Sequence, residues 1–251
     1  MNLKVLAIIP SRYDSSRFPG KPLASINGKS MIQRVYEQAT SCPGLHEVIV
    51  ATDDQRIFDH VVSFGGKVAM TSTNHQSGTD RCGEVLSNYK HEVDVVVNIQ
   101  GDEPFIHPKQ ISQLIAVFED SMVDISTLAK KINDDNQINN PNIVKVVRQS
   151  NSFALYFSRS PIPFARNTAQ GNWTKNQDYY KHIGIYAYKA KVLEALIQLP
   201  PSKLETTESL EQLRWLENGY KIHVGTTDLE SIGIDTPEEL QELNEKLKNN
   251  N

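Results

Sequence analysis

Runs of valine and isoleucine alternate with amphipathic segments through the first half of the chain. The apolar runs predict strands at residues 3–9, 47–51, 67–70 and 93–99. Apolar side chains at helical spacing predict helices at residues 30–40, 55–63, 78–89 and 108–120. Short continuous apolar strands that alternate with helices of this length are typical of a mostly parallel sheet covered on both faces.

The second half continues the alternation less regularly. It predicts strands at residues 124–129, 144–148, 184–188 and 221–225, and helices at 191–198, 208–218 and 237–246. Residues 158–178 are polar and rich in proline, which predicts an excursion or flap at about 154–180, and residues 248–251 read as a frayed tail. Because no linker interrupts the pattern, we expect a single three-layer α/β/α domain over residues 1–251, with a mostly parallel, mixed, Rossmann-like sheet.

Composition narrows the class of protein. The 251 residues are 39% hydrophobic and 22% charged, as in a globular protein with a sizeable core. The formal net charge of -4 argues against broad nucleic-acid binding, which needs a basic surface. No apolar run reaches the roughly 18 residues of a membrane span, and no signal-peptide pattern opens the chain. Cys42 and Cys82 form no CxxC pair. We therefore expect a cytoplasmic protein without a membrane anchor or zinc site.

The loop after the first strand carries Arg12, Arg17 and Lys21 among small polar residues and prolines. A loop that leaves the carboxyl end of a buried strand lies where open α/β sheets bind ligands. These three cations have only one nearby acid, Asp14, so the loop carries a net positive charge. Such a loop is typical of a polyphosphate site, because the negative charge of the phosphates must be neutralised before a nucleophile can attack phosphorus. The alternative is a solvated basic surface loop.

Two aspartates are candidates for a metal site. Asp102 follows the apolar strand at 93–99, and Asp235 comes just before a helix that Thr236 and Glu239 open as a capping box. Magnesium takes hard oxygen ligands and needs only one or two carboxylates when phosphates complete its shell. The alternative for Asp102 is an exposed acidic turn.

Three further segments hold polar groups beside predicted elements. In residues 75–81, Ser77 or Thr79 caps a helix, and the same helix end attracts anions. Residues 180–186 place His182 beside a strand, where a lone histidine is more often structural than catalytic. In residues 204–214 the leucines predict a core face and the charges a solvated face.

Together these segments resemble the 3-deoxy-manno-octulosonate cytidylyltransferases (CMP-Kdo synthetases) through nearly the whole chain. The most specific pieces are RFPGKPL (17–23), HQSGTDR (75–81), QGDEP (100–104), ALYFSR (154–159), LEQLR (210–214) and GIDTPEEL (233–240). Residues 167–177 match no pattern of this family. The resemblance implies a nucleotidyltransferase fold and transfer of CMP from CTP to the anomeric hydroxyl of an acidic eight-carbon ketosugar, Kdo, with release of pyrophosphate, for lipopolysaccharide biosynthesis.

The resemblance also implies roles for single residues, a magnesium cofactor and a homodimer to which residues 154–163 contribute. Arg17, Lys21, Asp102 and Asp235 would be catalytic, with the two aspartates as metal ligands. The nucleotide would be bound by Pro10, Arg12, Ser15, Lys21, Ser77, Gly78 and Gln100. The sugar would be bound by Arg17, Arg159, His182, Tyr186, Glu208, Glu211 and Gln212, and either Glu208 or Glu211 would face it.

Two alternatives remain open at this stage. One is the same reaction on an 8-amino analogue of the sugar, which the sequence does not separate from Kdo. The other is a nucleotide-binding protein without turnover, which the joint presence of Lys21, Asp102 and Asp235 disfavours.

Overall fold

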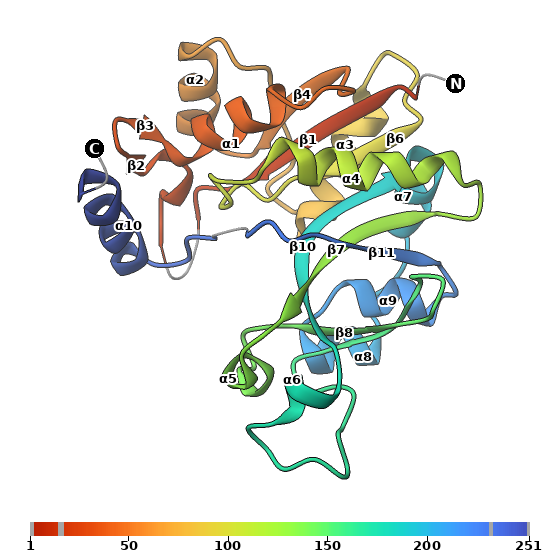
Figure 1. Cartoon of the computed structure of the whole chain (residues 1–251). Helices are drawn as coiled ribbons and strands as arrows, with labels where there is room; N and C mark the ends of the chain where they lie inside the picture. Colours follow the sequence, from red (N-terminus) through yellow and green to blue (C-terminus); the bar gives the residue numbers. More distant parts are fainter. Residues whose placement is uncertain (1–2, 15–17, 231–232, 250–251) are drawn as a thin grey trace. The chain divides into compact units, whose positions relative to one another are not determined.

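The computed structural model describes residues 3–14, 18–230 and 233–249 (Figure 1). The chain divides into two compact units, residues 1–112 with 231–251, and residues 113–230. None of the helices in the described part is long and apolar enough to cross a membrane.

The first unit is built around four parallel strands in the order β6-β1-β4-β5. Its elements are β1 (Val5–Ser11), a 3-10 turn (Lys21–Leu23), β2 (Ser25–Ile26), β3 (Lys29–Ser30), α1 (Met31–Thr40), β4 (Glu47–Thr52), α2 (Gln55–Ser63), β5 (Val68–Met70), α3 (Gly78–Asn88), β6 (Val95–Asn98) and α10 (Pro237–Asn249). The central strands are buried on both faces because α1, α2 and α3 pack against them. The predicted mostly parallel α/β sheet flanked by helices is therefore confirmed.

Helix α4 (Pro108–Ala116) leads from the first unit into the second, and a 3-10 turn (Val117–Glu119) extends it to one residue before the end of the predicted helix 108–120. The second unit contains β7 (Ile125–Ile132), α5 (Asp135–Asn139), β8 (Lys145–Arg148), β9 (Ala154–Ser158), α6 (Trp173–Asn176), β10 (Tyr179–Lys189), α7 (Ala190–Leu196), α8 (Lys203–Glu208), α9 (Gln212–Glu217) and β11 (Ile222–Thr226). Strand β7 pairs with β11 in parallel and with β10 antiparallel. Strand β8 pairs antiparallel with both β10 and β9, so this unit supplies the mixed part of the predicted sheet.

The predicted helix over residues 208–218 is confirmed only over Gln212–Glu217, and its predicted start is wrong. The chain forms α8 and α9 instead, because Ser209 between them has a left-handed backbone with φ of 52°. A left-handed residue ends a helix, since the next turn cannot continue from it. The capping box that Ser202 and Glu205 form starts α8 earlier than the predicted helix.

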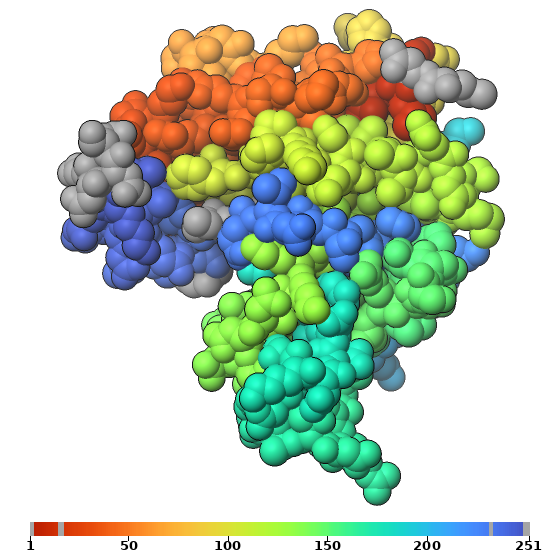
Figure 2. All heavy atoms as spheres, in the orientation of Figure 1, coloured from red at the N-terminus to blue at the C-terminus, as the bar shows by residue number. Residues whose placement is uncertain are grey.

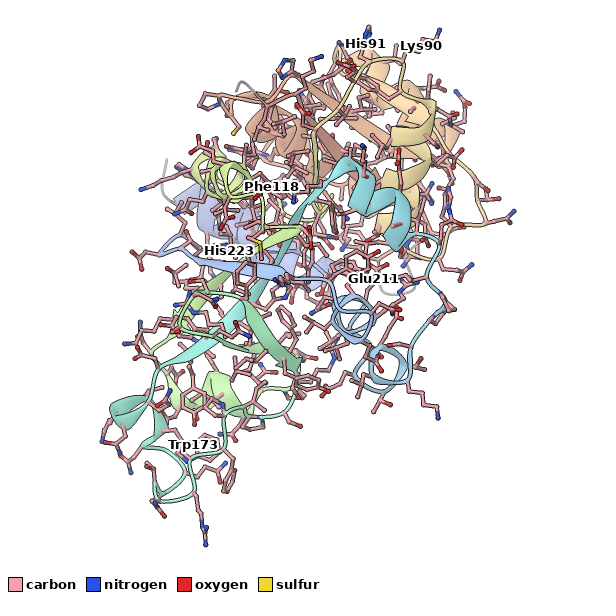
Figure 3. The ribbon with its side chains drawn as sticks, turned by 90° about the vertical axis from the view of Figure 1, so that its right-hand side faces the viewer. Lys90, His91, Phe118, Trp173, Glu211 and His223 are labelled. Carbon is pink, nitrogen blue, oxygen red and sulfur yellow. The ribbon has the colours of Figure 1, made fainter. Side chains whose placement is uncertain are left out.

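The segment between β9 and β10 forms one end of the second unit, where its teal atoms stand out in Figure 2. Trp173 anchors this segment by packing with Ile132, Ile138 and Tyr179, and Figure 3 shows Trp173 at the end of the unit away from Phe118. Asp135 accepts hydrogen bonds from the backbone N–H of Trp173 at 2.6 Å, which fixes the start of α6. The excursion thus shares a small apolar cluster with β7 and α5. Its action as a flap stays a prediction.

Candidate active site

A pocket of about 280 Å³ opens in the first unit where β1 and β6 end. These neighbouring strands run parallel, with Ile8 opposite Asn98, so the loops that follow them leave from the same edge of the sheet. Ligands of open α/β sheets bind at such carboxyl ends. The loop after β1 supplies cations and the loop after β6 supplies acids.

Most of the candidate residues of the first unit line this pocket. They are Pro10, Arg12, Lys21, Ser77, Gly78, Gln100, Asp102 and Asp235. Ser15 and Arg17 lie outside the described residues. The same pocket is also lined by residues to which the sequence analysis gave no individual role, although most lie in the motifs it named: Ser11, Pro22, His75, Gln76, Arg81 and Gly101.

The centre of the pocket is an ion cluster of Lys21, Asp102 and Asp235. The Lys21 Nζ donates to Asp102 Oδ2 at 2.7 Å and to Asp235 Oδ1 at 3.2 Å. The two carboxylate oxygens are therefore at most about 6 Å apart, although the residues are far apart in sequence. The lysine side chain is 13% exposed, Asp102 32% and Asp235 46%, so the acids face solvent more than the ammonium does.

The local fold of the residues around Gly20 fixes the position of Lys21. Gly20, with φ of 73°, opens the 3-10 turn in the left-handed region, which favours glycine. Its backbone N–H donates to the carbonyl of Tyr13 at 2.9 Å, and the Tyr13 ring lies 3.3 Å below the Arg56 guanidinium. These contacts close the cationic loop on itself and hold Lys21 in the pocket wall.

Packing of the carboxyl-terminal helix brings Asp235 to Asp102. Ile234 is buried with Ile26 and Met31, and leucines of α10 pack on the same cluster. The Ile234 backbone N–H donates to the Asp102 carbonyl at 3.1 Å, so the two acidic segments are joined directly. The predicted capping box is confirmed: Glu239 N–H donates to Thr236 Oγ1, and Glu239 Oε2 accepts from the Thr236 N–H, both at 3.3 Å.

The amino end of α3 forms another wall of the pocket. Ser77 caps the helix, because its Oγ accepts from Asp80 N–H and the Asp80 carboxylate accepts from Ser77 N–H, both at 3.1 Å. A Cβ on Gly78 would lie 3.1 Å from Pro10 Cγ, so glycine lets the helix end approach β1 closely. Helix amino ends attract anions, and this one faces the pocket.

The acids of the pocket suit a magnesium ion that a substrate helps to bind. No group of three or more histidine, cysteine or acidic side chains in the described part of the chain could hold a metal ion. Magnesium needs fewer protein ligands, since one or two carboxylates suffice when phosphate oxygens and waters complete its shell. Asp102 and Asp235, already held on one cation by Lys21, fit this donor set.

The second unit gathers another set of candidates around a bulge in β10. Ile183 of β10 pairs with Leu128 of β7, and Tyr186 pairs with the adjacent Thr127. Between these two pairs β10 therefore has two residues that have no counterpart in β7. Four residues of regular strand span about 13 Å, yet the rings of His182 and Tyr186 have centroids 5.3 Å apart. The bulge therefore brings these two candidate side chains together.

Burial sets the protonation of both side chains. It lowers the pKa of His182 to about 3, so the imidazole is neutral near pH 7. Burial, and then the charge of Glu211, raises the pKa of Tyr186 well above its usual value, so the phenol keeps its proton. Among the described residues, neither Tyr186 Oη nor the neighbouring Trp215 Nε1 has a hydrogen-bond partner. Tyr186 is 7% exposed and Trp215 1%, so both donors are buried and unsatisfied within the described part of the chain.

Glu208 and Arg159 are held by each other and by backbone groups. Glu208 Oε1 accepts from Ser158 Oγ at 2.6 Å, and Oε2 accepts from the Arg159 N–H at 2.9 Å. The Arg159 guanidinium donates to the carbonyls of Glu208, Pro141 and Ser209. This interlocked arrangement joins β9 to the end of α8.

Glu211 and Gln212 lie where α9 begins, and Figure 3 labels Glu211 in the segment that joins α8 to α9. Glu211 Oε1 accepts from Arg214 at 2.9 Å, and Gln212 is buried. Sequence reasoning missed Thr127 of β7, whose hydroxyl contacts His182 Nε2 at 2.9 Å. Its only signal was a polar residue inside an apolar strand.

Comparisons with known proteins agree with this geometry. The model of a cytidylyltransferase family matches residues 6–222. The chain is 56% identical over 250 residues to a 3-deoxy-manno-octulosonate cytidylyltransferase of Bacteroides thetaiotaomicron, covering 98% of this chain and 99% of the relative. It is 51% identical over 244 residues to an 8-amino-3,8-dideoxy-manno-octulosonate cytidylyltransferase of Shewanella pealeana, covering 95% and 96%. A solved CMP:2-keto-3-deoxy-manno-octonic acid synthetase complexed with CTP superimposes with a TM-score of 0.91 at 43% identity, covering 99% of this chain and all of that one.

Proposed function

The chain belongs to the cytidylyltransferase family, and on this premise we propose that it transfers CMP from CTP to the anomeric hydroxyl of Kdo. The products are CMP-Kdo, a precursor for lipopolysaccharide biosynthesis, and pyrophosphate. The observation that carries the proposal is the convergence of Lys21, Asp102 and Asp235 in a pocket at the strand ends. Relatives named for this reaction match nearly the full chain.

The pocket of the first unit is the proposed nucleotide site. Arg12 and Lys21 would neutralise the triphosphate, and the amino end of α3 at Ser77 and Gly78 would receive anionic or polar groups. Pro10 and Gln100 would line the remaining surface, and Ser15 is assigned to the same site on sequence alone.

The proposed reaction is a direct in-line displacement at the α-phosphorus. The bond from the sugar oxygen to phosphorus forms while the bond to the bridging oxygen of pyrophosphate breaks. Asp102 and Asp235 would hold magnesium, which when bound stabilises negative charge on the phosphates. Lys21, which contacts both acids, would then donate to phosphate oxygens, and Arg17 would serve the α-phosphate and the sugar.

His182, Tyr186, Glu211 and Gln212 of the second unit are the proposed sugar ligands. Support comes from a neutral imidazole, a phenol donor without a partner among the described residues, and Glu211 close enough to raise the pKa of that phenol. Glu208 is the weaker candidate, since Ser158 and Arg159 already occupy both of its oxygens. Arg159 would bind the sugar carboxylate only by releasing a backbone carbonyl.

A second candidate substrate is the 8-amino analogue of Kdo. The observation that favours it is the relative of Shewanella pealeana, which carries that name at 51% identity. Direct competition between the two sugars for CTP distinguishes the candidates, because the preferred sugar suppresses product from the other. We further propose that the protein acts in the cytoplasm as a homodimer, with residues 154–163 contributing to the contact.

The decisive experiment measures pyrophosphate release with CTP, UTP and ATP, each crossed with Kdo, its 8-amino analogue and other acidic ketosugars in the presence of magnesium. We expect release that requires CTP, metal and an eight-carbon sugar acid together. Absence of release from folded, metal-loaded protein across the panel would overturn the proposal. Tight CTP binding by calorimetry in that case would identify a nucleotide-binding protein without turnover.

A further inference from the structure

Thr127 is a fully buried polar residue in the middle of β7. It stands opposite Tyr186 of β10, at the position where the bulge shifts the pairing. Its hydroxyl reaches three groups of β10: the carbonyl of Ile185 at 2.8 Å, the carbonyl of Ile183 at 3.1 Å and Nε2 of His182 at 2.9 Å. One buried oxygen thus joins the bulge to the candidate sugar ligand.

The hydrogen-bond inventory of a hydroxyl decides the direction of each contact. A threonine hydroxyl has one proton and two lone pairs, and a carbonyl oxygen only accepts. The 2.8 Å separation from the Ile185 carbonyl is typical of an O–H···O bond. Without a proton between them, two acceptor oxygens at this distance would repel each other. The Thr127 proton is therefore committed to the bulge carbonyls.

His182 must then be the donor in its contact with Thr127. The hydroxyl can only accept from Nε2, so Nε2 carries the ring proton and Nδ1 keeps a lone pair. The low pKa that burial gives the imidazole keeps it neutral, so a second ring proton is absent near pH 7. His182 is nevertheless only partly buried, and Nδ1 has no partner among the described residues.

We propose that Thr127 is a positioning residue that fixes His182 in the Nε2-protonated tautomer, so that Nδ1 accepts a hydrogen bond from a hydroxyl of the sugar. The second half of this inference rests on the proposed function, because it takes the ligand of His182 to be a polyhydroxylated substrate. The first half rests on the contacts of Thr127 alone. The arrangement selects a hydroxyl donor at Nδ1 and rejects a carboxylate or carbonyl there.

The tautomer is measured directly by ¹⁵N NMR on protein labelled at histidine. The His182 signals are assigned by their loss in His182→Gln. We expect a pyridine-like nitrogen at Nδ1 and a protonated, pyrrole-like nitrogen at Nε2, with a mixture of tautomers in Thr127→Val. A wild-type ring protonated at Nδ1 would overturn the proposal, and this outcome can be read even if Thr127→Val does not fold.

Kinetics of pyrophosphate release test the role toward the sugar. Thr127→Val keeps the branched shape and removes the hydroxyl, and loss of one hydrogen-bonding partner of this kind should lower kcat/KM for Kdo about tenfold. The KM for CTP should stay within twofold, and Thr127→Ser should restore both sugar kinetics and tautomer. The matched control is Ser126→Ala, because Ser126 is the adjacent buried residue and its hydroxyl has no partner among the described residues.

The outcomes separate this proposal from the proposed function. Equal loss of kcat/KM for Kdo in Ser126→Ala, or a Thr127→Val enzyme with unchanged sugar kinetics, would overturn the positioning role. Failure of Thr127→Ser to restore the kcat/KM for Kdo would also overturn the positioning role. If the wild-type protein released no pyrophosphate with any sugar, the proposed function and the sugar half of this inference would fall together. The NMR experiment would still decide the tautomer.

Discussion

Replacing Lys21 by methionine should strengthen magnesium binding in the absence of nucleotide while abolishing most of the turnover. In the structure the Lys21 ammonium is the cation that Asp102 and Asp235 share, at 2.7 and 3.2 Å. A divalent ion bound by the same two acids competes with that ammonium. Lys21→Met keeps the length of the side chain and removes its charge, so it separates the electrostatic term from packing.

The magnitude follows from Coulomb's law. A single charge and a double charge about 4 Å apart repel by roughly 2 kcal/mol in a water-like dielectric. The water-like value is a lower limit, because the Lys21 side chain is only 13% exposed, whereas movement of the lysine away from the ion reduces the repulsion. We therefore expect magnesium to bind Lys21→Met about tenfold more tightly, which corresponds to about 1.4 kcal/mol.

Calorimetric titration with magnesium, at low ionic strength and without CTP, provides the measurement. Lys29→Met is the matched control, since the Lys29 ammonium pairs with exposed Glu37 at 2.7 Å and does not line the pocket. Adding Asp102→Asn to Lys21→Met should remove the gain. If Lys21→Met bound magnesium no more tightly than the wild-type protein, the two acids would not be the metal site.

Three further predictions follow from the same contacts. Asp102→Asn and Asp235→Asn should each lower kcat for pyrophosphate release by at least about a hundredfold, the scale of losing a charge stabiliser, with the melting temperature nearly unchanged. Gly101→Ala should weaken CTP binding in calorimetry, because its Cβ would lie 2.9 Å from the Pro10 carbonyl, a backbone atom that cannot move aside without shifting β1. The third concerns pH: the unfolded state protonates His182 below about pH 6.5, whereas the folded ring stays neutral down to about pH 3. The free energy of unfolding, measured with urea, should therefore fall by about 2 kcal/mol between pH 8 and pH 5 from this residue, and the fall should be smaller by that amount in His182→Gln.

Strands β1, β4 and β6 of the first unit could be predicted because they are buried on both faces and therefore read as continuous apolar runs. Strand β9 escaped prediction because it is only five residues long and its first three residues are partly buried or exposed, so it shows neither a long apolar run nor a clear alternation. The break between α8 and α9 escaped it because the left-handed conformation falls on Ser209, a residue that carries no turn signal as strong as glycine.

The sequence analysis identified Lys21, Asp102 and Asp235 as site residues, but it could not predict that they contact one another. Lys21 and Asp235 lie at opposite ends of the chain, and nothing local in either segment requires that they meet. Their contact depends on the burial of Ile234 in the core beside α10 and on its backbone bond to Asp102. Tertiary packing of this kind follows from the whole hydrophobic pattern and cannot be read from a motif.

The choice between Glu208 and Glu211 shows why the partners of a residue matter more than its type. In sequence the two acids stand three positions apart in one amphipathic segment and are equivalent candidates. In the structure Glu208 accepts hydrogen bonds from Ser158 and Arg159, so removing it would deprive the buried Ser158 hydroxyl and the Arg159 N–H of their acceptor. Glu211 instead acts on the pKa of Tyr186. Substitution of Glu208 should therefore act mainly on folding. Glu211 also accepts from the buried Arg214 at 2.9 Å, so its substitution should lower both the stability of the fold and kcat/KM for the sugar.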